Sequence, residues 1–170
     1  MGCKLVIAVL AAYSLAPGPV APIAAQSRLP VGPIPIPTPL YAVALNDLSF
    51  GTVLPGIPSS VTVQDPRAGV FEIRGPADAA VRVEFGLPPA LIAHDGSLLP
   101  VAFGHRDGLA GFSRQHSQGA YFDPRSPLIG ALGPDGRLFL RMGGTVTPGR
   151  PQTGGAYRAT IFMTVYDLGS

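Results

Sequence analysis

Glycine and proline interrupt this chain so often that a long helix has almost no room to form. The 170 residues include 22 glycines and 20 prolines, together about a quarter of the chain. Glycine supplies the backbone conformations that tight turns need, and proline cannot continue a helix or a central strand. Hydrophobic residues make up 46% of the sequence, which is typical of a folded chain and not of a disordered one. The expected result is a series of short strands joined by tight turns.

Alternation of apolar and polar side chains marks several of these strands. The clearest is 80–85, where Val81 and Val83 point one way and Arg82 and Glu84 the other. The same alternation places Phe71 with Ile73, and Leu138 with Leu140 and Met142. The expected strands are 41–50, 59–64, 69–74, 80–85, 98–103, 137–146 and 157–167, whereas 104–127 show no clear pattern. This spacing predicts an all-β fold, an Ig-like antiparallel β-sandwich, with a closed barrel as the alternative.

The N-terminus follows the plan of a secretory signal peptide over residues 1–25. Lys4 supplies a positive charge, 5–15 are apolar, and Ala24-Ala25 offers a small-residue cleavage site before Gln26. The apolar run is about half the roughly 20 residues needed to span a bilayer. We therefore predict export to the periplasm, cell surface or exterior, with no integral membrane span after cleavage. Cys3 is the only cysteine, so the mature chain is expected to contain no disulfide.

A proline-rich lead, residues 26–40, is expected to precede a single β-sandwich domain, residues 41–170. Pro33, Pro35, Pro37 and Pro39 all fall on positions of the same parity. In an extended strand, alternate residues direct their N–H groups to alternate edges, so the missing donors all lie on one edge. The lead is therefore predicted to pair along one side only, as a spacer or an edge strand.

The closing strand, 157–166, carries apolar groups on both faces. Ala159, Ile161, Met163 and Val165 share one face, and Phe162 and Tyr166 lie on the other. One face must form core. The other is expected to be covered by the N-terminal lead or exposed for a partner.

Several segments together resemble a bacterial family of secreted proteins of unassigned function, DUF4402. Residues 45–56 (LNDLSFGTVLPG) resemble its opening, and 71–75 (FEIRG) resemble the strand that follows. Residues 143–146 (GGTV) and 155–165 resemble its closing pattern. That closing pattern is also similar to the one in spore coat U-type subunits of archaic chaperone–usher pili. The resemblance covers about residues 45 to 167.

This resemblance implies a secreted, non-enzymatic structural or interaction module at the bacterial cell surface. The alternative that it implies is a pilin-like subunit, assembling by strand exchange with itself or with other surface or pilus subunits through edge strands. The chain departs from the pilin pattern because it lacks the disulfide common in pilins. It also departs because its lead pairs on one edge only, whereas a donor strand inserted between two strands uses both.

The sequence predicts no catalytic and no cofactor-binding residue, because it contains no nucleophile elbow, zinc-protease, P-loop or dinucleotide motif. The candidate metal ligands are His94, His105, Asp107 and His116, since imidazole and carboxylate suit zinc and similar ions. The alternative interpretation is that they are loop residues, with Asp107-Gly108 forming a turn. A metal-dependent enzyme is therefore the rival from another functional class.

Nucleic acid and carbohydrate are two further classes of partner. The net charge is only +2 and the arginines are scattered, so nucleic acid is not expected as a partner. Aromatic residues could instead form a surface for stacking sugars, in a glycan-binding or glycan-active protein, although aromatics more often fill strands. The residues concerned are Tyr41, Tyr121, Phe122, Tyr157, Phe162 and Tyr166.

Overall fold

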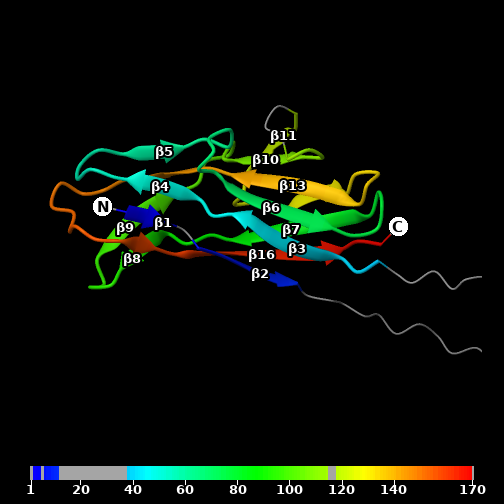
Figure 1. Cartoon of the computed structure of the whole chain (residues 1–170), viewed down its shortest axis with the longest axis horizontal. Coiled ribbons are helices and arrows are strands. Elements are labelled where there is room, and N and C mark those ends of the chain that lie inside the picture. The colour runs from blue at the N-terminus through cyan, green and yellow to red at the C-terminus, as the bar shows by residue number, and fades with distance from the viewer. Residues whose placement is uncertain (1, 5, 12–37, 115–117, 170) are drawn as a thin grey trace, which may run out of the picture.

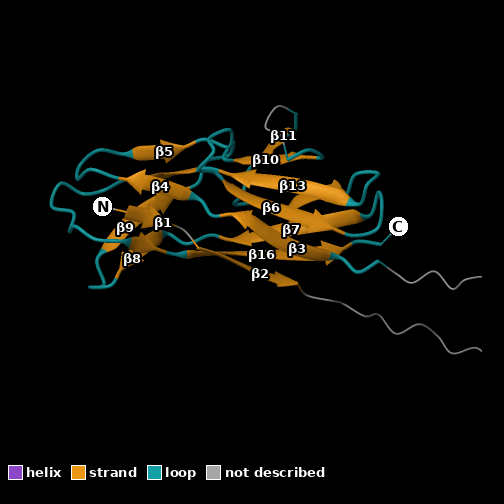
Figure 2. Ribbon diagram, in the orientation of Figure 1, coloured by secondary structure: helices purple, strands orange, loops and turns teal. Residues whose placement is uncertain are grey.

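The computed structural model describes residues 2–4, 6–11, 38–114 and 118–169 (Figure 1). Strands and loops make up all of these residues, and no helix occurs among them (Figure 2). The first eight strands are β1 Gly2–Lys4, β2 Val6–Ala11, β3 Tyr41–Asn46, β4 Ser49–Thr52, β5 Ser59–Val61, β6 Gly69–Arg74, β7 Ala80–Gly86 and β8 Ala90–Ala93. The others are β9 Leu98–Ala102, β10 Gly108–Gly111, β11 Ala120–Phe122, β12 Leu128–Ala131, β13 Arg137–Met142, β14 Gly144–Val146, β15 Tyr157–Arg158 and β16 Thr160–Asp167. The prediction of an all-β fold is confirmed.

Three sheets build the molecule. A five-stranded sheet has the order β11-β10-β13-β6-β3, and a four-stranded sheet has the order β12-β7-β16-β2. A seven-stranded sheet, β4-β1-β15-β8-β9-β14-β5, lies at the other end of the long axis, on the left in Figure 1. Most neighbouring strands run antiparallel, and the packed sheets form the predicted β-sandwich.

The chain passes between the seven-stranded sheet and the other two sheets at several places, of which three are short links. β3 leads into β4, β13 into β14, and β15 into β16, and in each pair one strand belongs to the seven-stranded sheet. Gly143 separates β13 from β14 and lies so close to β5 that a Cβ there would stand 2.3 Å from the Val61 carbonyl oxygen. Only glycine allows this approach without a backbone shift. Close packing of the backbone against β5 therefore requires glycine at position 143.

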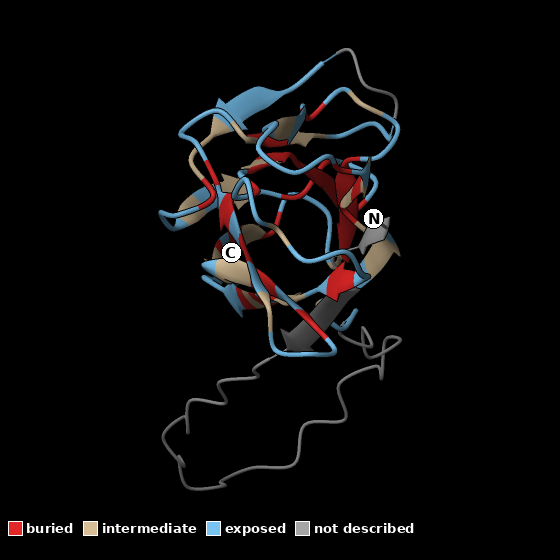
Figure 3. Cartoon of the chain, turned by 90° about the vertical axis from the view of Figure 1, so that its left-hand side faces the viewer, coloured by how far each residue is buried: buried red, intermediate tan, exposed pale blue. Residues whose placement is uncertain are grey.

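The hydrophobic core fills the space between the sheets, and in an end-on view the buried segments are enclosed by exposed loops (Figure 3). Every sheet contributes to one continuous cluster of buried side chains. Its largest fully buried members are Tyr157, Phe50, Phe71, Leu48, Ile73, Leu91, Leu99, Leu132, Leu140, Met142 and Ile161. Cys3 is the only cysteine of the chain, so no disulfide can form within it and this burial is the main source of stability.

The predicted strand faces agree with the structure where alternation was clearest. On β7, Val81 and Val83 are fully buried, whereas Arg82 and Glu84 lie outside and form an ion pair with each other. On β6, Phe71 and Ile73 are likewise in the core. Alternation identified these inward faces correctly, because one side of each strand packs between the sheets.

The outer face of the five-stranded sheet is more buried than alternation indicates. Phe139 and Arg141 lie on the outward side of β13, yet only 8% and 6% of their surfaces are exposed. The Arg141 guanidinium donates hydrogen bonds to the carbonyl oxygens of Val63 and Asp65. The segment after β5 therefore covers this face.

Tyr157 closes a loop at the start of the final strand pair. Its ring is fully buried, and its hydroxyl donates to the Thr153 carbonyl oxygen at 2.7 Å. The same hydroxyl accepts a hydrogen bond from Gln152 Nε2 at 2.7 Å, and that amide also donates to the Leu98 carbonyl at 3.1 Å. The hydroxyl thus connects the loop 152–153 to β15, and through Gln152 to β9.

Replacing Tyr157 with phenylalanine is expected to lower the free energy of unfolding by about 1–3 kcal/mol, because it leaves the Thr153 carbonyl without its partner. Urea denaturation followed by circular dichroism measures this change. Tyr166→Phe is the matched control, since its exposed hydroxyl stands 3.5 Å from Glu84 and should change stability little. Equal effects of the two substitutions would contradict the role given to the Tyr157 hydroxyl.

Candidate interface at the edge of the closing strand

β16 carries one buried and one exposed face. Ile161 and Met163 are fully buried and Val165 is 4% exposed, so this face belongs to the core. On the other face, Phe162 is 49% and Tyr166 37% exposed. The sequence left open whether this outer face is covered by the lead. The described residues leave it largely exposed, and residues 26–37 of the lead lie outside them.

The two edges of β16 have different neighbours. β7 pairs with it antiparallel along one edge, from Phe162 opposite Gly86 to Asp167 opposite Val81. β2 pairs with it parallel along the other edge, from Thr160 opposite Val6 to Val165 opposite Ala11. Residues 6–11 belong to the predicted signal peptide. The outer edge of the closing strand is therefore occupied by a segment that signal cleavage would remove.

β2 lies where the two layers of the sandwich meet. It is the last strand of the four-stranded sheet, so its ladder runs along β16 alone. β3, the last strand of the five-stranded sheet, lies next to it. A strand in this position is thus paired through its backbone on one side only.

Charged side chains on the nearby strands β7 and β6 form ion pairs within each strand. Arg82 pairs with Glu84 and stands 5.7 Å from the centre of the Tyr166 ring. On the opposite layer, Arg74 donates to Glu72 at 2.7 Å and thereby lowers the pKa of that buried carboxyl. The lowered pKa keeps the Glu72 carboxylate charged, which is unlike the raised pKa expected of a general acid.

The candidate metal ligands that the structure describes lie in two turns, one with His94 and the other with His105 and Asp107. His94 is exposed in the turn between β8 and β9, beside Asp95, whose carboxylate accepts hydrogen bonds from Ser97. His105 is exposed in the turn before β10, where the Asp107 carboxylate accepts the Gly104 N–H at 2.6 Å. His116 lies outside the described residues. Among the residues that are described, no three histidine, cysteine or acidic side chains form a group able to hold a metal.

Asp123 is a further acidic residue near His105. Both of its carboxylate oxygens accept hydrogen bonds from Arg125, at 2.9 and 2.7 Å. This pairing lowers the pKa of Asp123 to about 2, with a smaller contribution from His105. The carboxylate is thus held by a neighbouring arginine in a surface turn.

The aromatic residues considered for sugar stacking do not share one surface. Tyr157 is fully buried, and Phe122 stacks on Phe85 at 6.0 Å between ring centres. Tyr121 is exposed on β11, with the Arg106 guanidinium 4.4 Å from its ring centre. Tyr41 lies on β3, whereas Phe162 and Tyr166 share the outer face of β16. Only this last pair forms a common exposed strip.

Sequence reasoning missed the pairing of residues 6–11 with β16. The segment VIAVLA is apolar and contains three β-branched residues, which suits a buried strand as well as the apolar part of a signal peptide. Its content therefore allowed both interpretations, and its position near the N-terminus, after Lys4 and ahead of the Ala24-Ala25 cleavage site, favoured the second.

No family model matches the chain, and a search of curated proteins gives no significant match. The resemblance to DUF4402 and to archaic pilins therefore stays a prediction. Helices long and apolar enough to cross a bilayer are absent from the part of the chain that the structure describes.

Proposed function

We propose that this chain is an exported, non-enzymatic interaction module of the bacterial cell surface, and that it contacts partners through the outer edge of β16. The observation that carries the proposal is the pairing of β2 with β16. Cleavage after Ala25 would remove β2 and leave a row of unpaired backbone donors and acceptors. Such an edge is a template for pairing with another strand.

The buried face of β16 supports this proposal. Ile161 and Met163 are fully buried in the core, and β7 holds the opposite edge. The strand therefore stays in place when its outer edge is freed. A partner strand at this edge would gain main-chain hydrogen bonds from β16 and would lie beside β3.

A second candidate, a pilin-like subunit that assembles by strand exchange, is favoured by the geometry at this edge. The position of β2 demands backbone pairing with one strand only. The lead is predicted to pair on one side only, and a strand at this position needs no more than that to be exchanged between subunits. Residues 33–38 from a second copy could place Ile34, Ile36 and Thr38 with their N–H groups toward β16 and the prolines on the free side.

Hydrogen exchange on residues 26–170 tests the interaction edge. We expect the β16 amides that face the outer edge to exchange much faster in this form than in a full chain whose signal cleavage site is blocked. The β16 amides bonded to β7 serve as the internal control and should stay protected in both forms. Full protection of every β16 amide in monomeric 26–170 would mean that the edge is closed, and would overturn both candidates.

Size-exclusion chromatography with light scattering separates the two candidates. Strand exchange predicts oligomers for residues 26–170, monomers for 41–170, and a higher melting temperature when a peptide of residues 29–40 is added to 41–170. A peptide carrying Ile34→Asp and Ile36→Asp should not bind, whereas Pro35→Ala should, because that proline faces away from β16. If residues 26–170 are monomeric and the outer β16 amides exchange fast, the interaction module is supported and self-assembly is rejected.

A further inference from the structure

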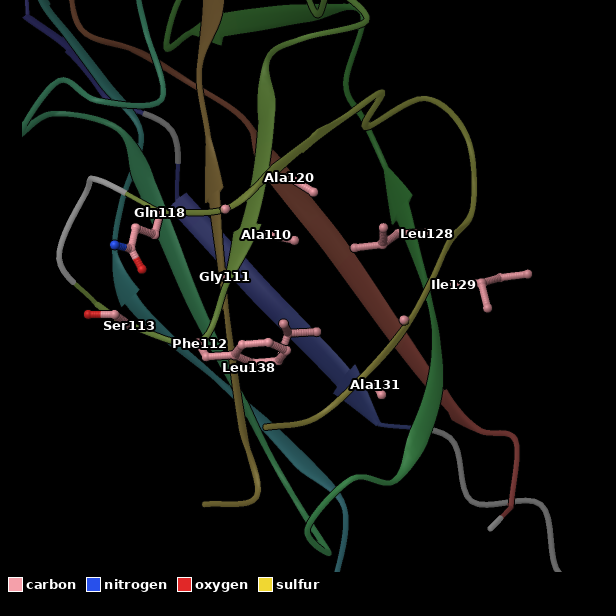
Figure 4. A pocket seen from close by; sticks show the side chains of 12 residues that line it. Ala110, Gly111, Phe112, Ser113, Gln118, Ala120, Leu128, Ile129, Ala131 and Leu138 are labelled. Atoms are coloured by element: carbon pink, nitrogen blue, oxygen red, sulfur yellow. The ribbon is translucent and has the colours of Figure 1, made fainter. Parts of the chain in front are cut away.

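A cavity lies on the side of the sandwich away from β2, between β12 and β11, which are the end strands of the two layers. It has a volume of about 510 Å³ and is partly open to solvent, and Figure 4 shows the side chains that line it. Twelve residues of β10, β11, β12, β13 and the loop after β10 line it. Such a volume falls within the range of pockets that bind small molecules, roughly 300–1,000 Å³.

The cavity exists because small residues occupy inward positions. Ala110 packs against the core from β10, and Leu128 does so from β12. Gly130, two residues after Leu128, faces the same way but has no side chain, and a Cβ built there would meet no atom within 4 Å. Interiors are usually packed without such voids. The end of the core at this side is therefore left unfilled.

None of the described residues that line the cavity carries a charged side chain. Ala110, Ala120, Leu128 and Leu138 supply apolar surface, and Phe112, 58% exposed, stands at the rim. The polar side chains of Ser113 and Gln118 lie at one end, directed away from the apolar groups (Figure 4). An ion inside this cavity would lose its hydration without gaining a partner, so the lining excludes a charged occupant.

We propose that this cavity binds the hydrocarbon chain of a neutral single-chain amphiphile, with its polar end toward Ser113 and Gln118. A dry cavity of about 150 Å³ holds one benzene molecule. The present volume is more than three times as large, and because its mouth is open we expect a chain of about ten carbons to fit. Leu128 and Leu138 contact the chain along its length, and it fills the space that a side chain at position 130 would occupy.

Fluorescence titration tests this site with the neutral probe N-phenyl-1-naphthylamine and the full chain. We expect saturable binding of one probe per chain, and its displacement by decan-1-ol. Gly130→Leu should weaken probe binding at least tenfold and raise the melting temperature by about 2–4 °C, because its side chain fills the cavity. The backbone at Gly130 has no positive φ, so the substitution causes no backbone strain. Gly130→Ala provides a smaller step in the same direction if the leucine variant folds poorly.

Gly154→Leu is the matched control, because position 154 also has open space and no positive φ but lies outside the cavity. Its probe binding should equal that of the unaltered chain. Absence of saturable binding, or unchanged binding in Gly130→Leu and Gly130→Ala, would overturn the proposal. Failure of decan-1-ol to displace the probe would do the same. The chain could instead dimerise through this cavity. In that case its molecular mass would double as the concentration rises, and Gly130→Leu would restore the monomer mass, which would overturn the proposal.

Discussion

Replacing Val83 with aspartate is expected to prevent folding. Val83 is fully buried in the centre of β7, between β12 and β16. A carboxylate there would be buried without a hydrogen-bond donor or an opposite charge, which belongs to the most damaging class of substitution, about 4 kcal/mol or more. Small domains have a total stability of about 5–15 kcal/mol. Circular dichroism and the yield of soluble protein measure the loss.

Arg82→Asp is the control one residue away. Arg82 lies on the outer face of β7, where its ion pair with Glu84 is partly exposed. Exposed pairs contribute about 1 kcal/mol or less, so this variant should fold with a small decrease in melting temperature. If both variants fold equally well, or both fail, the inward and outward faces of β7 have been assigned wrongly.

The contrast between these neighbours shows what the sequence could predict. Strict alternation in 80–85 is a period-2 signal over a whole strand, and it identified both the strand and its buried face. The closing strand was predicted for a similar reason, since Ile161, Met163 and Val165 recur at every second position. Where one face packs in a core and the other contacts water, the pattern of side chains is sufficient.

Other strands had no such signal. β12 is only four residues long, LIGA, and its inward Gly130 breaks the apolar pattern at the place where the cavity lies. β8, residues 90–93, is short and follows two prolines. The break between β3 and β4 divides what the sequence predicts as one strand, 41–50, and a shift in the pairing of β3 with β6 accompanies it. Short elements of this kind depend on tertiary pairing more than on local pattern.

The candidate interface was predictable in part. The two apolar faces of β16 indicated that one of them would need a neighbour, and the parity of the prolines indicated a segment that pairs on one side. The sequence could not place the outer edge of β16, because edges are set by which distant strands meet. Nor could it reveal the burial of Glu72, which depends on Arg74 and Arg137 converging from different strands.

Aromatic rings form a continuous series through the core, from β6 through β7 to β11. Phe71 is fully buried and meets Phe85 edge to face, with ring centres 5.6 Å apart. Phe85 in turn stacks on Phe122. This series joins the two layers, because β6 and β11 belong to the five-stranded sheet and β7 to the four-stranded sheet. Aromatic pairs add about 0.5–1.5 kcal/mol beyond the area that they bury.

Phe71→Ala is expected to lower the free energy of unfolding by about 3–5 kcal/mol, since it leaves a cavity in the core and removes the contact with Phe85. Phe162→Ala makes the same chemical change on a strand, but at a side chain that is 49% exposed, and should cost about 1 kcal/mol or less. Urea denaturation of both variants, with the slope checked for two-state behaviour, gives the comparison. A loss at Phe71 no larger than that at Phe162 would mean that the two layers do not pack through this residue.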